Sequence, residues 1–118
     1  MKGYKVVSVC NNGRLRSAVG GYTQITYYLI DGDTIPIKSC GPLTCFRTRE
    51  AARYFKRSMR RGAELQIWEC DFVESEKDSV WVPGCVTPKW ILVYRNSHLL
   101  DDRTCVLADR IRLLRRVR

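Results

Sequence analysis

GPLTCFRTREAARYFKRSMRRGAELQIWEC, residues 41–70, is the stretch that decides the fold. Its opening Gly-Pro is typical of a turn, and the short apolar run 43–46 that follows is typical of a buried strand. Thr48 stands where a helix N-cap is expected. The stretch therefore predicts a strand, a helix over about 49–60 and a second strand over 65–73.

The predicted helix has one apolar and one basic side. At about 100° per residue, Ala52 and Phe55 lie on one side and the cations lie on the other. The cations of the basic side are Arg49, Arg53, Lys56, Arg57, Arg60 and Arg61. Cations at i, i+3 and i, i+4 spacing repel each other. Two interpretations stay open: a solvated outer face of a helix packed on a sheet, or a docking surface for a polyanion.

Strand patterns dominate the rest of the chain. Residues 2–10 have the alternation and the branched side chains of a strand. The Asn11-Asn12-Gly13 turn after them predicts a tight hairpin into 14–19. Further strand candidates are 22–30, 34–38, 80–82, 90–94 and 111–117, although the last is also compatible with a helix. The expected fold class is α+β, a single domain over 1–118 in which one main helix packs on a mostly antiparallel twisted sheet.

The net charge of +9 is unevenly distributed along the chain. Residues 47–61 carry seven cations and one acid, and residues 103–118 carry six cations and one acid, whereas 64–78 are acidic. We therefore expect the C-terminal arginines to extend the basic surface of the helix, with Arg112, Arg115 and Arg116 as binding residues. Such a surface attracts anionic partners without identifying them.

Six cysteines and one histidine do not form a recognisable site. An even number of cysteines is compatible with disulfides, but no secretory signal is recognised, so buried free thiols are expected. Cys40 and Cys45 are followed by no second close pair, and His98 is the single histidine, so the spacing of structural zinc is not met. We expect no metal and no cofactor.

The hydropathy pattern indicates no membrane contact. No apolar run approaches the roughly 20 residues of a spanning helix, and no charged start followed by an apolar stretch indicates a signal peptide. A cytoplasmic protein is therefore expected. Strands near Pro36 or at the C terminus could pair across a two-fold axis, which leaves a homodimer open.

Two carboxylates share one face of the strand predicted over 65–73. Residues at i and i+2 point the same way, so Glu69 and Asp71 could act as acid and base, or orient a ribose, if a pocket lay above them. An ordinary polar sheet face is the alternative interpretation.

Several segments resemble a group of small uncharacterised proteins from phage and microbial genomes. The segments lie across most of the chain, at residues 3–7 (GYKVV), 41–43 (GPL) with 45–46 (CF), Thr48 and Ala52, 67–70 (IWEC), 108–110 (ADR) and 113–117 (LLRRV). The resemblance implies a single domain and no particular function.

The chain is also faintly similar to the ADP-ribosyltransferase-like fold, in which a first strand, a strand entering a helix and a strand bearing a glutamate surround a nicotinamide nucleotide. Tyr4-Lys5, residues 46–54 and Glu69 would take those places. Relative to that fold, the first strand lacks a His or Arg to hold the nucleotide, and no Ser-Thr-Ser run precedes the helix.

Two functions of different classes follow. The favoured one is a non-enzymatic binding protein whose basic helix and C-terminal arginines contact nucleic acid phosphates or an acidic protein surface, with Tyr54 available for stacking. The alternative is a nucleotide-handling enzyme with Glu69 as its acidic residue and Tyr4, Thr44 and Tyr54 lining a pocket, or a catalytically inactive relative of one.

Overall fold

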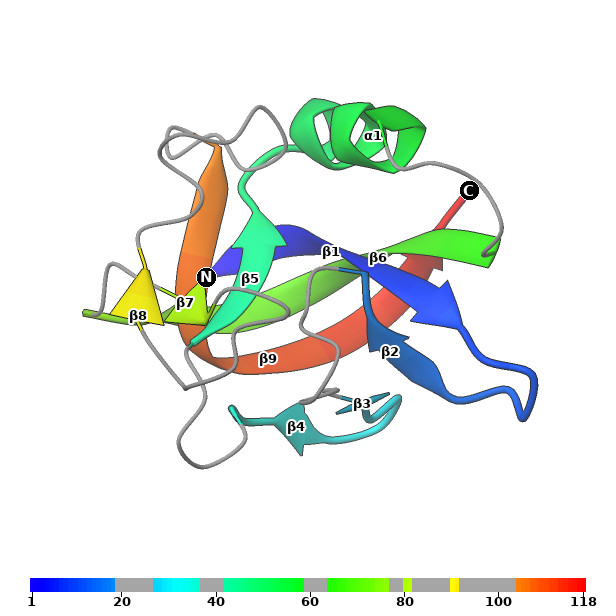
Figure 1. Cartoon of the computed structure of the whole chain (residues 1–118), viewed down its shortest axis with the longest axis horizontal. Coiled ribbons are helices and arrows are strands. Elements are labelled where there is room, and N and C mark those ends of the chain that lie inside the picture. Colours follow the sequence, from blue (N-terminus) through cyan, green and yellow to red (C-terminus); the bar gives the residue numbers. More distant parts are fainter. Residues whose placement is uncertain (19–26, 37–41, 59–63, 77–79, 82–89, 92–103) are drawn as a thin grey trace.

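The computed structural model describes residues 1–18, 27–36, 42–58, 64–76, 80–81, 90–91 and 104–118. The elements within these ranges are β1 (Lys2–Val9), β2 (Leu15–Ser17), β3 (Tyr27–Tyr28), β4 (Asp33–Thr34), β5 (Leu43–Phe46), α1 (Arg49–Ser58), β6 (Glu64–Glu74), β7 (Val80–Trp81), β8 (Trp90–Ile91) and β9 (Cys105–Val117) (Figure 1). Every strand pair among them is antiparallel. The predicted α+β class, with one helix on a mostly antiparallel sheet, is confirmed for this part of the chain.

Four of the strands close into a small barrel. β1 pairs with β6 along its whole length, β6 pairs with β9, β9 pairs with β5, and β5 returns to β1 through Tyr4 and Phe46. β2 and β3 extend the sheet beside the second half of β1, and β4 extends it beside β9. The sheet is therefore closed on itself, which the strand patterns in the sequence do not indicate.

Gly3 allows β5 to approach β1 closely enough for this closure. A Cβ at Gly3 would lie 2.8 Å from the carbonyl oxygen of Phe46 and 2.9 Å from Cε1 of Phe72. The first contact involves backbone, so it could be relieved only by moving β5. A glycine is therefore required at the point where β1 meets both β5 and β6.

α1 begins at the residue that the sequence predicts. The Thr48 hydroxyl accepts a hydrogen bond of 3.1 Å from the backbone N–H of Ala51, which satisfies one of the free amides of the first turn. Glu50 lies in that first turn, near the positive end of the helix dipole. The helix is described as far as Ser58, and the last two residues of the predicted span lie outside the described residues.

The predicted hairpin after β1 is confirmed. Gly13 has a φ of 83°, a left-handed conformation that glycine adopts without strain. The backbone N–H of Gly13 donates to the carbonyl of Cys10 (2.9 Å), and that of Cys10 donates to the carbonyl of Arg14 (2.8 Å). β2 then pairs with β1 as predicted.

The C-terminal segment is a strand, as predicted, and it begins earlier than expected, at Cys105. β7 and β8 fall within the two strands predicted near them and pair with each other. β3 and β4 are only two residues long, and parts of the strands predicted around them, 22–26 and 37–38, lie outside the described residues.

Alternation along the strands separates two apolar clusters. The interior of the barrel is filled by Val7, Leu15, Tyr28, Leu43, Cys45, Cys70, Phe72, Val106, Ala108, Ile111 and Leu113. A second cluster lies between the barrel and α1, and it consists of Val6, Phe46, Ala52, Phe55, Ile67, Cys105 and Leu107. α1 therefore covers one side of the barrel, while β3 and β4 lie on the opposite side (Figure 1).

The described part of the chain contains no helix with the length and apolar character that crossing a membrane requires.

Candidate polyanion interface

The outer face of α1 carries a row of cations whose direction is set by the packing of the helix. Ala52 (0% exposed) and Phe55 (2%) lie against the barrel, so the opposite side of α1 faces solvent. Arg53, Lys56 and Arg57 are exposed there, and Arg49 is partly buried at the start of the helix. None of the four forms an ion pair with another described residue. These four residues are called the α1 cationic face below.

Arg49 differs from the other three because it contacts an aromatic ring. Its guanidinium carbon lies 5.8 Å from the ring centroid of Tyr4 on β1, within cation–π range. This contact fixes the first cation of the row against the barrel and leaves the other three extended into solvent.

The arginines of β9 have a different environment, because acidic side chains from neighbouring strands reach them. Nε of Arg112 lies 2.9 Å from a carboxylate oxygen of Asp33, and Arg110 approaches the same carboxylate at 3.5 Å. The hydrogen bond from Arg112 lowers the pKa of Asp33 and raises the pKa of Arg112. Arg115 pairs with Glu69 at 3.3 Å.

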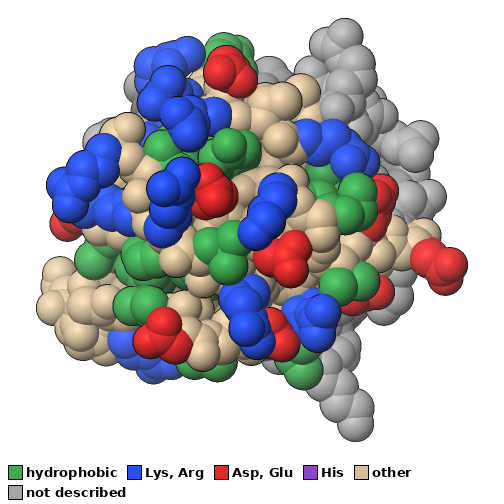
Figure 2. Space-filling view, turned by 180° about the vertical axis from the view of Figure 1, so that it is seen from behind, with side chains coloured by type: hydrophobic (Ala, Val, Ile, Leu, Met, Phe, Trp, Pro, Cys, Tyr) green, Lys and Arg blue, Asp and Glu red, His purple; other side chains and the backbone are tan. Residues whose placement is uncertain are grey.

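Strand register explains why these pairs form. In the register of the sheet, Asp33 on β4 lies opposite Arg112 on β9, and Arg112 lies opposite Asp71 on β6. Lys2 of β1 lies opposite Asp71, so the four strands carry charges of alternating sign in one row. Figure 2 shows Lys and Arg side chains interspersed with Asp and Glu over much of the face it presents. Cross-strand neighbours of opposite charge stabilise a sheet.

The structure therefore divides the predicted binding residues. Arg49, Arg53, Lys56 and Arg57 form the α1 cationic face, whereas Arg112 and Arg115 are ion-paired on β9. Arg60 and Arg61 lie outside the described residues.

Arg116 is the one predicted β9 residue without an ion pair to another described residue, and its side chain is exposed. The next residue, Val117, packs against the cluster beneath α1, and the chain end lies beside that helix (Figure 1). Because successive residues of a strand point to opposite faces, Arg116 leaves β9 on the face away from α1, the face of its register partner Trp68.

Glu69 and Asp71 share one face of β6, as predicted, but each carboxylate has a cationic partner. Glu69 is 23% exposed and bonds to Arg115, while Asp71 accepts a hydrogen bond of 2.9 Å from the N-terminal ammonium of Met1, which lowers the pKa of Asp71. Tyr4 lies opposite Glu69 in the register.

The other two residues of the predicted nucleotide pocket are not assembled around Glu69. Thr44 is buried, and its hydroxyl accepts a hydrogen bond from Lys5. Tyr54 is 54% exposed on the outer side of α1. One of these side chains is thus buried in the fold, whereas the other faces solvent.

Lys5 is a buried cation that the sequence analysis does not predict. It is 1% exposed, and its ammonium donates hydrogen bonds to the Thr44 carbonyl (2.7 Å), the Thr44 hydroxyl (3.1 Å) and the Ser17 hydroxyl (3.0 Å). Nζ also lies 5.0 Å from the ring centroid of Tyr28. Alternation along β1 places Lys5 on the same side as Val7, and this signal was present in the sequence.

The position of Lys5 explains its burial. One edge of β1 pairs with β5 at Tyr4 and with β2 from Val7 onward, so the partner strand changes beside Lys5. The ammonium bridges the two strands by bonding to Ser17 of β2 and Thr44 of β5. Burial lowers the pKa of Lys5 from 10.5 to about 8. We interpret Lys5 as a structural link across this seam.

The structure describes Cys10, Cys45, Cys70 and Cys105; Cys45 and Cys70 are buried free thiols, as expected, and Cys10 is a partly buried one. Cys45 and Cys70 both lie in the interior of the barrel. The neighbouring Cys70 thiol, together with burial, raises the pKa of Cys45. The other two cysteines of the sequence lie outside the described residues.

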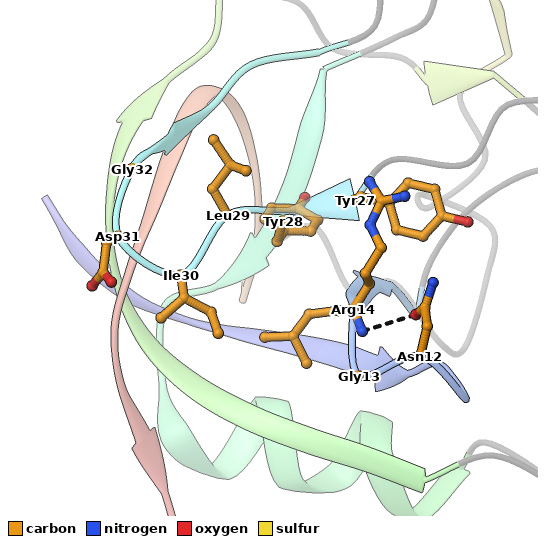
Figure 3. A pocket seen from close by; sticks show the side chains of 10 residues that line it. Asn12, Gly13, Arg14, Tyr27, Tyr28, Leu29, Ile30, Asp31 and Gly32 are labelled. Atoms are coloured by element: carbon orange, nitrogen blue, oxygen red, sulfur yellow. Dashed lines mark hydrogen bonds between the residues drawn. The ribbon is translucent and has the colours of Figure 1, made fainter.

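An open pocket of about 560 Å³ lies between the turn after β1 and residues 27–32 (Figure 3). The guanidinium of Arg14 stacks over the Tyr27 ring at 3.8 Å, and Leu29 and Ile30 are about half exposed at 57% and 50%. None of the predicted binding or catalytic residues lines this pocket. The lining residues Tyr27 and Tyr28 form β3, which lies on the side of the barrel away from α1 (Figure 1).

No group of three or more metal-ligating side chains occurs within the described ranges. No protein-family model matches the chain, and neither a curated protein nor a solved structure shows significant similarity to it.

Proposed function

We propose that this protein binds nucleic acid through its phosphates, using the α1 cationic face. One observation carries the proposal: the exposed cations of α1 have no acidic partner among the described residues, whereas those of β9 at Arg112 and Arg115 have one. A cation held beside an acid has already lost much of its attraction for a phosphate. The four cations of the α1 cationic face form no such pair with a described residue and therefore retain their attraction for a phosphate.

The chemistry of the face suits a phosphate partner. Three of its four cations are arginines, and a guanidinium can donate two parallel hydrogen bonds to one phosphate. Residues three or four apart on a helix are about 5–6 Å apart, so Arg53 and Arg57 can contact the same strand.

The nucleotide-handling alternative gains no support from the described residues. Glu69 is ion-paired with Arg115, and the residues that would line its pocket are dispersed. We therefore propose no catalytic step.

Fluorescence anisotropy with a labelled oligonucleotide tests the proposal. If four cations each neutralise one phosphate of a single strand, affinity should fall about 50-fold between roughly 50 and 200 mM salt. In the double variant Arg53→Gln/Arg57→Gln, which keeps two contacts, affinity should be lower and the same salt change should reduce it only about sevenfold.

Arg112→Gln/Arg115→Gln is the matched control, because it removes the same net charge from ion-paired positions. We expect its affinity and salt dependence to stay near those of the unmodified protein. Equal losses in both double variants would indicate a response to net charge alone and would contradict the proposal. Absence of binding at about 50 mM salt would also contradict it, as would equally tight binding of polyglutamate, which would indicate an acidic protein surface as the partner.

A further inference from the structure

Tyr54 is an exposed aromatic residue beside the α1 cationic face. Its side chain is 54% exposed, and helical spacing places it next to Arg57, three residues later. Among the described residues of α1 it is the one large hydrophobic side chain that faces solvent.

The packing of α1 keeps Tyr54 on the outer side of the helix. Phe55, the next residue, is 2% exposed, and its ring centroid lies 5.2 Å from that of Phe46. Ala52 is completely buried on the same side. In addition, the Ser58 hydroxyl donates a 2.9 Å hydrogen bond to the Tyr54 carbonyl in the last described turn. The helix cannot rotate to bury Tyr54 without exposing Phe55.

An exposed ring beside arginines that form no ion pair with a described residue distinguishes between forms of nucleic acid. In a duplex, each base is stacked between its neighbours, so an exposed tyrosine on a helix that lies flat on a barrel has no base face to contact. In a single strand the base faces are available, and stacking on an aromatic side chain adds to the attraction between arginine and phosphate. Stacking is tolerant of sequence because every base has a flat face.

We propose that the partner is single-stranded nucleic acid, with a base stacked on Tyr54 while the adjoining phosphates contact Arg53 and Arg57; this inference rests on the proposed function. α1 is ten residues long, which corresponds to about 15 Å. The contact therefore spans only a few nucleotides, and one stacked base supplies a large share of the preference for single strands.

The test compares three probes of equal length: a 20-nucleotide oligothymidylate, the same backbone with abasic sites, and a 20-base-pair duplex. The protein variants are Tyr54→Ala, which removes the ring, and Tyr54→Phe, which keeps it. We expect Tyr54→Ala to bind oligothymidylate at least about fivefold more weakly, the lower limit for loss of one stacked base. Its binding to the abasic probe should be unchanged, and Tyr54→Phe should match the unmodified protein on every probe.

The outcomes separate this inference from the proposed function. If no probe binds at low salt, the proposed function itself fails. If all three probes bind equally well and Tyr54→Ala has no effect, phosphate binding stands and the single-strand inference is overturned. A loss on the abasic probe as large as that on oligothymidylate would also overturn it. Thermal unfolding of Tyr54→Ala checks that this substitution, made at an exposed position, leaves the fold intact.

Discussion

Among the described elements, α1 and β9 are the two that are rich in arginine, and they differ in what surrounds their charges. The exposed cations of α1 face solvent and form no ion pair with a described residue, although Glu50 lies on the same helix. On β9, Arg112 contacts Asp33 and Arg115 contacts Glu69. A cluster of cations in a sequence therefore does not by itself predict a positive surface, because its acidic partners can come from distant segments.

The difference follows from the kind of element that carries the charges. β9 lies between β6 and β4, and strand register brings acids to it across 46 residues for Glu69 and 79 residues for Asp33. α1 has no strand on either side of its outer face, and its contacts with the barrel use apolar residues. Three perturbations test this comparison.

The largest effect is expected from detaching α1. Phe55→Ala removes a ring that is 2% exposed, and such a truncation typically destabilises a protein by about 3–5 kcal/mol. Urea unfolding measures the loss, and anisotropy should show weaker oligonucleotide binding because the α1 cationic face is no longer held in place. Phe55→Leu should give a smaller loss in the same direction if the alanine variant does not fold. A loss below about 1 kcal/mol would mean that α1 is not anchored through this residue.

The second effect concerns Lys5, a cation that has neither water nor an acid around it. Its pKa is about 8 in the folded protein, whereas the ordinary pKa of a lysine is 10.5, so between these pH values the unfolded chain binds more protons. The free energy of unfolding of the unmodified protein minus that of the variant Lys5→Met should therefore be constant below pH 8. From there toward pH 10.5 this difference should rise by about 1 kcal/mol per pH unit.

Urea unfolding of both proteins at pH 7, 8, 9 and 10 gives this difference. The comparison is needed because Cys45 and Tyr28 have raised pKa values and oppose the rise in this range. Both residues are present in the two proteins, so their contributions largely cancel. A difference that does not change with pH would show that Lys5 does not titrate below its ordinary range.

The smallest effects expected are changes in the free energy of unfolding when one arginine of β9 or of α1 is replaced, and the two changes should differ in direction. Arg115→Gln removes the partner of Glu69 and should destabilise the protein by about 0.5 kcal/mol, a loss that diminishes in about 1 M salt. Arg53→Gln relieves repulsion on α1 and should be neutral or stabilising by a few tenths of a kcal/mol. Thermal unfolding at low and high salt measures both. Equal effects of the two substitutions would contradict the contrast between paired and unpaired cations.

Much of the local structure could be predicted because its causes lie within a few residues. Thr48 caps α1 through a hydrogen bond to Ala51, three positions away. The apolar side of the helix and the two faces of β6 follow from helical and strand periodicity. For the same reason, Glu69 and Asp71 were correctly placed on one face.

Closure of the barrel could not be predicted in this way. It depends on β5 meeting β1 while β9 meets both β5 and β6, and these pairings join segments far apart in sequence. Gly3 indicates a close approach only once its neighbours Phe46 and Phe72 are known. Lys5 shows the same limit: its place in the alternation indicates an inward side chain, but its acceptors come from two other strands.

The candidate site likewise combines features that local sequence determines with features that depend on long-range contacts. The amino-acid sequence contains a basic helix face and an arginine-rich C terminus, and helical periodicity is sufficient to place the first on one side of α1. Tertiary structure decides which of these cations remain unpaired, because ion pairing depends on strand register over tens of residues. The two arginine clusters are therefore alike in composition and differ in the acids that the fold brings to them.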